Sequence, residues 1–193
     1  KYLIFARHGM EIKHFQSIEK YLSTYKERLA PKPSSYKGRD WKGRKPGSYK
    51  WYEIQDTVDY YLEFEKPKII VPAIVQTASY AYDLNSIYSN DKTCIIPTED
   101  LYLLGLLNSR VCDFVMHRIS STKQGGYYEY KPMYVSQLPI KTIDFTNSAQ
   151  KTRHDNIVNL VEQMLEAKQK LNAAKNDAET NRLEHLCASL DRQ

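Results

Sequence analysis

The 193 residues are enough for one domain with a hydrophobic core plus an appendage. Hydrophobic residues make up 41% and charged residues 26% of the sequence, proportions typical of soluble globular proteins, and no apolar run is long enough to span a bilayer. The formal net charge of +5 favours an acidic partner.

The beginning of the chain predicts a strand followed by a helix. Tyr2–Arg7 is an apolar, strand-like run, and the chain starts with Lys1 rather than Met, so we expect a piece of a longer protein. Across His14–Ala30, apolar residues recur at the spacing of an amphipathic helix. Pro31 is expected to end that helix, because the residue before a proline disfavours helical geometry.

The segment from Pro31 to Tyr52, PKPSSYKGRDWKGRKPGSYKWY, predicts a long irregular loop, called the basic loop below. It contains seven Lys or Arg residues against Asp40 alone, so it carries +6 while the rest of the chain sums to −1. Cations neutralise phosphates, and aromatic rings and polar tips contact sugars and base edges. We interpret the loop as a nucleic-acid contact. A flexible excursion that only aids solubility is the alternative, but two Trp and three Tyr are unusual in a disordered segment.

We expect ordered structure again from Trp51, at WYEIQD. The sequence of the middle of the chain then predicts short strands. Pro67–Val75 is β-branched and nearly uncharged, as in a buried strand, with Pro72 marking a bulge or an edge. Ser79–Asp83 and Thr93–Pro97 are two further short strands, and the turn-rich segment between them predicts a hairpin-type connection.

A helix is predicted over Glu99–Ile119, with Thr98 as its N-cap and a broad apolar face packed on the sheet. Tyr127–Ile140 follows the Gly125-Gly126 pair and reads as a strand-like run. Alternating short strands and amphipathic helices indicate an α/β fold with a twisted mixed sheet and packed helices.

From Ser148 onward the sequence predicts a long helical arm that breaks near Glu179–Asn181. Its seven cations balance seven anions, and a narrow apolar seam runs along it, features of a docking or coiled-coil-like arm rather than of a DNA surface. We therefore expect a recognition domain over residues 1–145 and a helical arm over residues 146–193.

Motifs for catalysis are missing from the sequence. It has no glycine-rich phosphate loop, no His/Cys metal motif, no nucleophile elbow and no methyltransferase tetrapeptide. Cys94, Cys112 and Cys187 are odd in number and widely spaced, which favours a reducing cytoplasm over a disulfide framework. The Glu129-x-Lys131 triplet with Asp113 upstream resembles a metal-dependent nuclease pattern, but Asp113 falls in a predicted helix, so chance is the better explanation.

Polar residues outside the basic loop could also contact DNA, because Gln and Arg can bond base edges bidentately and Lys grips phosphates. Some lie near predicted strand ends and others flank the double glycine. The candidate DNA-binding residues are Lys32, Tyr36, Lys37, Arg39, Trp41, Lys42, Arg44, Lys45, Tyr49, Lys50, Gln55, Gln76, Thr77, Ser79, Lys123 and Lys131. We predict no catalytic and no metal-binding residues.

A series of segments resembles a known family. KYLIFARHG, WYEIQD, FEKPKII, YAYD, TCIIP, LYLLGLLNSR and GGYYEYKPMYVSQLPI follow one another in the order of the TaqI-like C-terminal specificity domain. This is the target recognition domain of adenine-N6 DNA methyltransferases and of fused type IIG restriction-modification enzymes. The resemblance spans about residues 1–145, and the long helix after it also fits.

The resemblance implies sequence-specific binding of double-stranded DNA, with a catalytic methyltransferase domain of the same parent chain flipping the target adenine. S-adenosylmethionine, and optionally Mg²⁺, would then be cofactors of the parent enzyme and not of this fragment, which would not itself be an enzyme. The alternatives are the recognition domain of a type I restriction specificity subunit and a non-enzymatic interaction module for an acidic partner. No membrane partner is expected.

Overall fold

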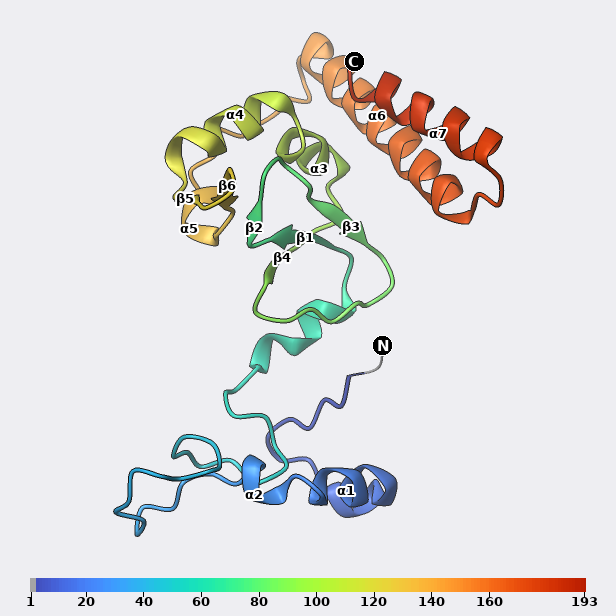
Figure 1. Ribbon diagram of the computed structural model, residues 1–193. Coiled ribbons are helices and arrows are strands. Elements are labelled where there is room, and N and C mark those ends of the chain that lie inside the picture. The colour runs from blue at the N-terminus through green and yellow to red at the C-terminus, as the bar shows by residue number, and fades with distance from the viewer. Residues whose placement is uncertain (1–2) are drawn as a thin grey trace. The chain divides into compact units, whose positions relative to one another are not determined.

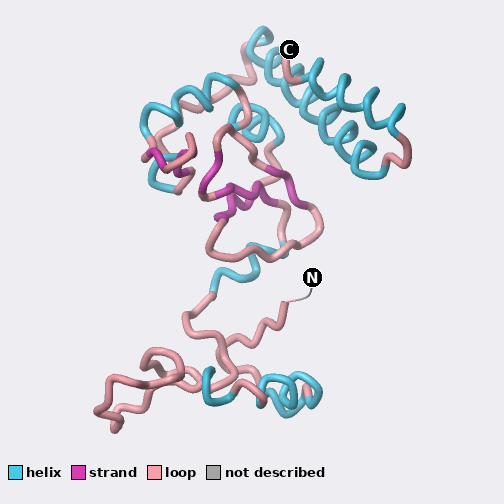
Figure 2. The backbone as a smooth tube through the Cα atoms, in the orientation of Figure 1, coloured by secondary structure: helices cyan, strands magenta, loops and turns pink. Residues whose placement is uncertain are grey.

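The computed structural model describes residues 3–193, which divide into two compact units, one ending at Leu62 and one spanning Glu63–Gln193 (Figures 1 and 2). The strand predicted for Tyr2–Arg7 is wrong as far as it can be followed. Leu3–Arg7 has no regular secondary structure, and Tyr2 lies outside the described residues. No helix of the described residues is both long and apolar enough to cross a membrane.

The helix predicted for His14–Ala30 is interrupted. A 3-10 turn at Ile12–His14 precedes α1 (Gln16–Ser23), and α2 (Lys26–Leu29) follows after a break. At the break, the Thr24 hydroxyl donates to the Tyr21 carbonyl at 2.7 Å, and the Tyr25 backbone leaves helical geometry. Such local side-chain bonds compete with the helix ladder. Ala30 is extended before Pro31, so the predicted end of the helix is confirmed.

The second unit holds six short strands in two sheets. The first sheet has the order β3-β1-β4, from β1 (Lys68–Pro72), β3 (Ala81–Asp83) and β4 (Thr93–Pro97). The second has the order β2-β6-β5, from β2 (Ile74–Val75), β5 (Thr122–Lys123) and β6 (Tyr127–Glu129). A 3-10 helix at Asp59–Glu65 precedes β1. The α/β class is confirmed, but all pairings are antiparallel and one mixed sheet is replaced by two.

One residue explains why the predicted strand at Pro67–Val75 serves both sheets. The Ala73 amide donates to the Lys92 carbonyl, and the Ala73 carbonyl accepts from the Tyr130 amide, both at 2.9 Å. Because Pro72 has no N–H, β1 ends there and the chain passes into the second sheet.

The hairpin predicted between Ser79–Asp83 and Thr93–Pro97 is wrong. Both strands pair with β1, which lies between them, with Ile69 opposite Tyr82 on one side and Ile96 on the other. The connection turns because the buried Asp83 carboxylate accepts the Asn85 amide at 2.9 Å and the Ile87 amide at 2.8 Å.

A buried ion pair joins β1 to β3. Lys68 is 0% and Asp83 2% exposed, and the Lys68 ammonium bonds both the Asp83 carboxylate and the Phe64 carbonyl, the latter at 2.6 Å. Burial alone would raise the pKa of Asp83, but the Lys68 ammonium and two amides hold that pKa below its ordinary value. The stability from this lowered pKa is therefore full at neutral pH and is lost as the pH falls through the folded-state pKa.

The helix predicted over Glu99–Ile119 is two helices, α3 (Leu101–Leu107) and α4 (Arg110–Ile119). Asp100 rather than Thr98 caps α3, and the Ser109 hydroxyl caps α4. At the break, the Asn108 side chain accepts the Tyr80 amide at 3.0 Å and donates to the Tyr80 carbonyl at 3.1 Å. It thereby satisfies the backbone of the residue just before β3. The apolar faces of both helices enter the main core, which includes Ile69, Val71, Tyr80, Leu104, Leu107, Cys112, Met116, Tyr130 and Leu138.

The strand-like run predicted for Tyr127–Ile140 is shorter than expected. It forms β6, which pairs with β5 across the double glycine, and then α5 (Pro132–Val135), which begins on a proline suited to the first helical turn. The long arm is α6 (Ser148–Ala173) and α7 (Asp177–Leu190), which folds back beside it (Figure 1). The break lies at residues 174–176, earlier than predicted, because Asn176 caps α7.

Two neighbours fill the apolar seam of α6. Leu183, Cys187 and Leu190 of α7 are buried, and Cys187 and Leu190 pack with Ala167. On the other side α6 lies against α3 at Gly105, where an added Cβ would come within 2.8 Å of Val161 and 2.9 Å of Ile157. Within its own unit, the apolar side of α6 is therefore covered by α7 and α3.

We expect Lys68→Met to lower the free energy of unfolding by about 3–5 kcal/mol, because it leaves the Asp83 carboxylate buried without its cation. Lys66→Met is the matched control, since Lys66 forms an exposed pair with Glu63 that should contribute less than about 1 kcal/mol. Native-state hydrogen exchange at the β1 amides measures the difference. Equal effects of the two substitutions would contradict the structural role of the buried pair.

Gly105→Ala should destabilise the packing of α6 on α3. At an exposed helix position, replacing glycine by alanine stabilises the helix by about 1 kcal/mol. At Gly105 the added methyl group would crowd two β-branched side chains, which costs about 1–3 kcal/mol. We expect Val161→Ala to cost less in the Gly105→Ala background than alone, because it removes one clashing methyl group. Thermal unfolding of the single and double variants measures this coupling, and strictly additive effects would refute close packing at Gly105.

Candidate nucleic-acid interface

The basic loop is irregular, as predicted, but its two ends are tied together. Pro31 and Arg44 form an isolated parallel bridge, in which the Lys32 amide donates to the Arg44 carbonyl at 3.0 Å and the Arg44 amide to the Ala30 carbonyl at 2.9 Å. The bridge closes the first half of the loop into an excursion over residues 32–43.

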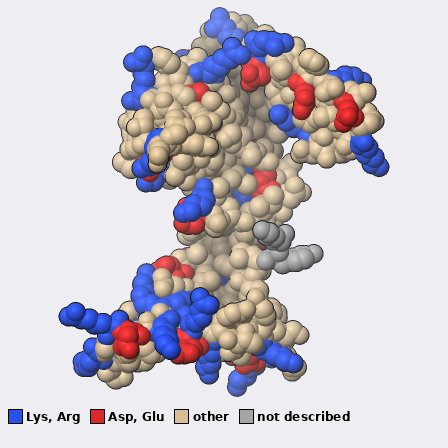
Figure 3. Space-filling view, in the orientation of Figure 1, with Lys and Arg blue, Asp and Glu red and all other residues tan. Residues whose placement is uncertain are grey.

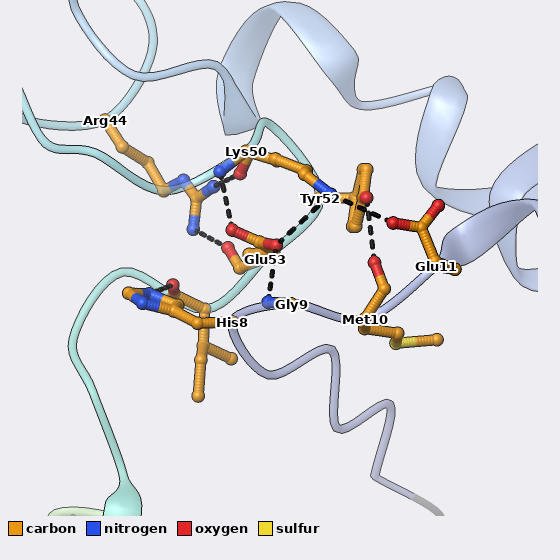
Figure 4. Close-up of polar contacts among 9 residues, drawn as sticks. His8, Gly9, Met10, Glu11, Arg44, Lys50, Tyr52 and Glu53 are labelled. Carbon is orange, nitrogen blue, oxygen red and sulfur yellow. Dashed lines mark hydrogen bonds and ion pairs between the residues drawn. The ribbon is translucent and has the colours of Figure 1, made fainter.

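The Arg44 guanidinium holds the base of this excursion through main-chain carbonyls. Nε donates to Leu29 at 2.5 Å, Nη1 to Glu53 at 2.7 Å and Nη2 to Trp51 at 3.0 Å. A longer contact of 3.5 Å joins Nη2 to the Lys50 carbonyl. The planar fork therefore binds both ends of the basic loop, and its contacts with Lys50 and Glu53 are drawn in Figure 4. A guanidinium engaged in this way is poorly placed to contact bases.

Glu53 is the second fastening point. Its carboxylate is 4% exposed and accepts the Gly9 amide at 2.9 Å and the Lys50 amide at 2.7 Å. The neighbouring Ile54 amide donates to the Ala6 carbonyl at 2.7 Å, and the Tyr52 hydroxyl donates to Met10 at 2.9 Å. These bonds join the end of the basic loop to the N-terminal segment (Figure 4).

Tyr49 is an internal residue of the loop. Its side chain is 4% exposed, its ring lies under the Arg44 guanidinium at 4.5 Å, and its hydroxyl donates to the Lys45 carbonyl. A buried ring with its hydroxyl satisfied is part of the loop's core. Tyr49 and Arg44 therefore form the frame of the loop, and their predicted contact with DNA remains a prediction that this geometry does not favour.

The tip of the excursion, residues 36–41, is fixed by side-chain contacts. The Tyr36 hydroxyl donates to Asp40 Oδ1 at 2.5 Å, which lowers the pKa of Asp40 and raises that of Tyr36. The Lys32 ammonium donates to the Gly38 carbonyl at 3.0 Å, and the Trp41 ring packs edge-on against Tyr36 at 5.2 Å. Lys32, Tyr36 and Trp41 thus shape the tip.

The remaining cations lie on the surface of the loop, and acidic residues lie near some of them (Figure 3). Lys42 is 3.7 Å from Glu27, Lys45 is 3.2 Å from Asp56, and Lys50 is 3.5 Å from Glu11. These pairs are exposed and weak, so phosphates could displace them. Gln55 lies 3.4 Å from the Asp56 carboxylate. Within residues 3–193, Lys37 and Arg39 have no hydrogen bond or ion pair at all, and both are exposed.

Three candidates of the second unit, Gln76, Lys123 and Lys131, lie at the β5–β6 hairpin. The Gln76 side-chain amide donates to the Gly125 carbonyl at 3.0 Å. The Gln76 backbone carbonyl lies 3.0 Å from His117 Nε2, and the His117 ring stacks on Tyr128 at 3.9 Å. The exposed Thr77 follows Gln76 directly, and the exposed Ser79 lies two residues further on. Lys123 and Lys131 both bond the Glu129 carboxylate at 2.9 Å, so each already has an anionic partner.

The nuclease-like pattern does not form a metal site. Lys123 and Lys131 lower the pKa of Glu129 and neutralise its charge, and Asp113 Oδ1 accepts the Ala78 amide and the Tyr130 hydroxyl, both at 2.6 Å. Burial, with this bond to Asp113, raises the pKa of Tyr130, so the phenol stays protonated. No cluster of three His, Cys, Asp or Glu side chains in the described part of the chain could hold a metal ion.

Sequence reasoning missed the residues that position the site. Glu53 lies in WYEIQD, where its position directly after two aromatic residues was a usable signal for a buried carboxylate. The His117–Tyr128 stack left no signal, because the two residues come from α4 and β6 and meet only in the folded chain.

The family model described as the TaqI-like C-terminal specificity domain matches residues 1–140. It therefore covers both the unit with the basic loop and the two sheets with α3 and α4, and it ends before α6. No curated protein matches the sequence.

Arg44→Lys should loosen the basic loop, because one ammonium cannot replace a fork that bonds several carbonyls in different directions. We expect local stability to fall by about 2 kcal/mol, since the abandoned carbonyls lose charge-assisted hydrogen bonds. Arg39→Lys is the matched control and should change stability by less than about 0.5 kcal/mol. Hydrogen exchange at the Lys50, Glu53 and Ile54 amides reports the loss. Equal protection in the two variants would show that Arg44 does not hold the loop.

Proposed function

The chain belongs to the TaqI-like C-terminal specificity domain family, and we propose that it selects a short sequence in double-stranded DNA for an adenine-N6 DNA methyltransferase. The observation that carries the proposal is the basic loop, which presents exposed cations on a frame made by Arg44, Tyr49 and Glu53. When the cations already have fixed positions, binding phosphates requires little further ordering of the loop, so less conformational entropy is lost and the affinity is higher.

The structure supports a division of roles among the loop residues. Lys37, Lys42 and Lys45 are exposed and suit phosphates, and Arg39 suits a base edge. Lys32, Tyr36, Trp41 and Lys50 shape or border the contact surface. Gln55 lies in the segment that follows the loop. Arg44 and Tyr49, in this proposal, act on DNA only by holding the loop in place.

In the second unit, the β5–β6 hairpin offers a further set of contacts. Gln76, Thr77 and Ser79 could bond bases or sugars, and Lys123 and Lys131 could exchange part of their pairing with Glu129 for DNA phosphates. The proposal assigns these residues to supporting contacts, because their polar groups are partly engaged within the protein.

The catalytic step would belong to another part of the enzyme. The chain has no methyltransferase tetrapeptide, and its acidic residues at Glu129 and Asp113 are engaged in structural bonds. We infer that a catalytic methyltransferase domain binds S-adenosylmethionine and receives the flipped adenine, while this chain fixes the register on the duplex. A restriction-modification system in the cytoplasm, including a type IIG enzyme fused to a nuclease, fits this role.

Neutralising the exposed lysines of the loop should flatten the salt dependence of DNA binding. Each phosphate contact contributes a slope of about −0.9 in a plot of log affinity against log salt, so Lys37→Gln/Lys42→Gln/Lys45→Gln should reduce the slope by about 2–3 units. Titration of a labelled duplex at several salt concentrations measures this. Arg44 is left intact so that the loop keeps its fold.

The matched control removes three exposed cations from the arm, Lys168, Lys175 and Arg182, and should leave the slope nearly unchanged. A full slope in the loop variant would exclude the loop as the contact surface. Binding without any preference among DNA sequences would instead support an interaction module for acidic partners.

A further inference from the structure

The tip of the basic loop is built around Gly38. A Cβ at this position would lie 2.8 Å from both Asp40 Oδ1 and the Tyr36 ring, so a larger residue would force these two side chains to shift from the positions in which they form their hydrogen bond. The Lys32 ammonium reaches the Gly38 carbonyl from the other side of the excursion. The tip therefore has a defined shape before any ligand binds.

This closed tip carries Lys37 and Arg39, two cations of the basic loop that have no hydrogen bond or ion pair within the described residues, one on each side of Gly38. Asp40 is the only acidic residue of the basic loop and is adjacent to Arg39, but it already accepts the Tyr36 hydroxyl. The Asp40 carboxylate thus bonds Tyr36 and not Arg39, and the Arg39 guanidinium makes no hydrogen bond or ion pair within the described residues.

Arginine and lysine differ in what they can recognise. The guanidinium is a planar fork that matches the O6 and N7 acceptors of guanine in the major groove, whereas an ammonium acts as a point charge on phosphate. Arg44 is the other arginine of the basic loop, and its fork is used internally. Arg39 is therefore the loop residue best able to distinguish one base from another.

We propose that the tip is a preformed guanine reader, in which Arg39 bonds the O6 and N7 edge of one guanine and Lys37 contacts a neighbouring phosphate. The inference rests on the proposed DNA-binding function and adds to it the chemical identity of one base in the target. Tyr36 acts as a positioning residue, because its hydroxyl keeps Asp40 away from Arg39.

The first experiment selects bound duplexes from a randomised library with the wild-type chain, Arg39→Gln and Lys37→Gln. The wild type should enrich a site that contains a guanine. At that position the preference for guanine over other bases should fall about ten- to hundredfold in Arg39→Gln and not in Lys37→Gln. Lys37→Gln should weaken binding to all sequences alike and reduce the salt slope by about one unit. Tyr36→Phe should lower the guanine preference less than Arg39→Gln and leave the salt slope unchanged.

The second experiment replaces that guanine with 7-deazaguanine, which pairs normally with cytosine but lacks the N7 acceptor. Wild-type affinity should fall, and the affinity of Arg39→Gln should not change. Equal losses in the two proteins, or a uniform loss across all sequences in Arg39→Gln, would overturn the guanine contact and assign Arg39 to phosphate. A wild-type chain that enriches no sequence at all would instead refute the proposed function itself.

Discussion

Hydrogen bonds to its own backbone determine the shape of the basic loop. Tyr49 is the only buried side chain between Pro31 and Tyr52, so the hydrophobic effect contributes little there. Because the loop has no regular secondary structure, its buried backbone carbonyls must accept hydrogen bonds from side chains or water. Arg44 donates such bonds to three carbonyls, one before the loop and two at its end, and the Glu53 carboxylate accepts two backbone amides. These two side chains fix the base of the loop, which carries the exposed cations that would meet a duplex.

The second unit shows the same use of polar side chains, at the places where the family motifs meet. FEKPKII and YAYD are joined by the Lys68–Asp83 pair, and LYLLGLLNSR reaches YAYD through Asn108. The residues by which the family is recognised therefore include those that hold its frame together. This explains why motif resemblance identifies the class of domain but not the bases that it selects.

The α/β class, β4 and the start of α6 could be predicted, because a β-branched run and the Asn147 cap are local signals. The breaks at Thr24 and Asn108 could not, because each depends on the hydrogen bonds of one side chain, and the Tyr80 partner of Asn108 lies far away in the sequence. The same limit applies to the site. The sequence shows how many cations the basic loop holds, but only the fold shows that Arg44 binds Leu29 and Glu53 while Arg39 binds nothing within the described chain.

The partners of Arg44 and of the Glu53 carboxylate are mostly main-chain groups, which every amino acid except proline supplies in full. Neighbouring side chains can therefore be exchanged without disturbing the frame. A lineage could retarget such a domain by replacing the residues on either side of Gly38, while the scaffold beneath them accumulates no compensating change. The residues at the tip of the basic loop can therefore change in evolution while its frame is kept, because the hydrogen bonds of the frame go to main-chain groups and do not depend on which side chains the partners carry.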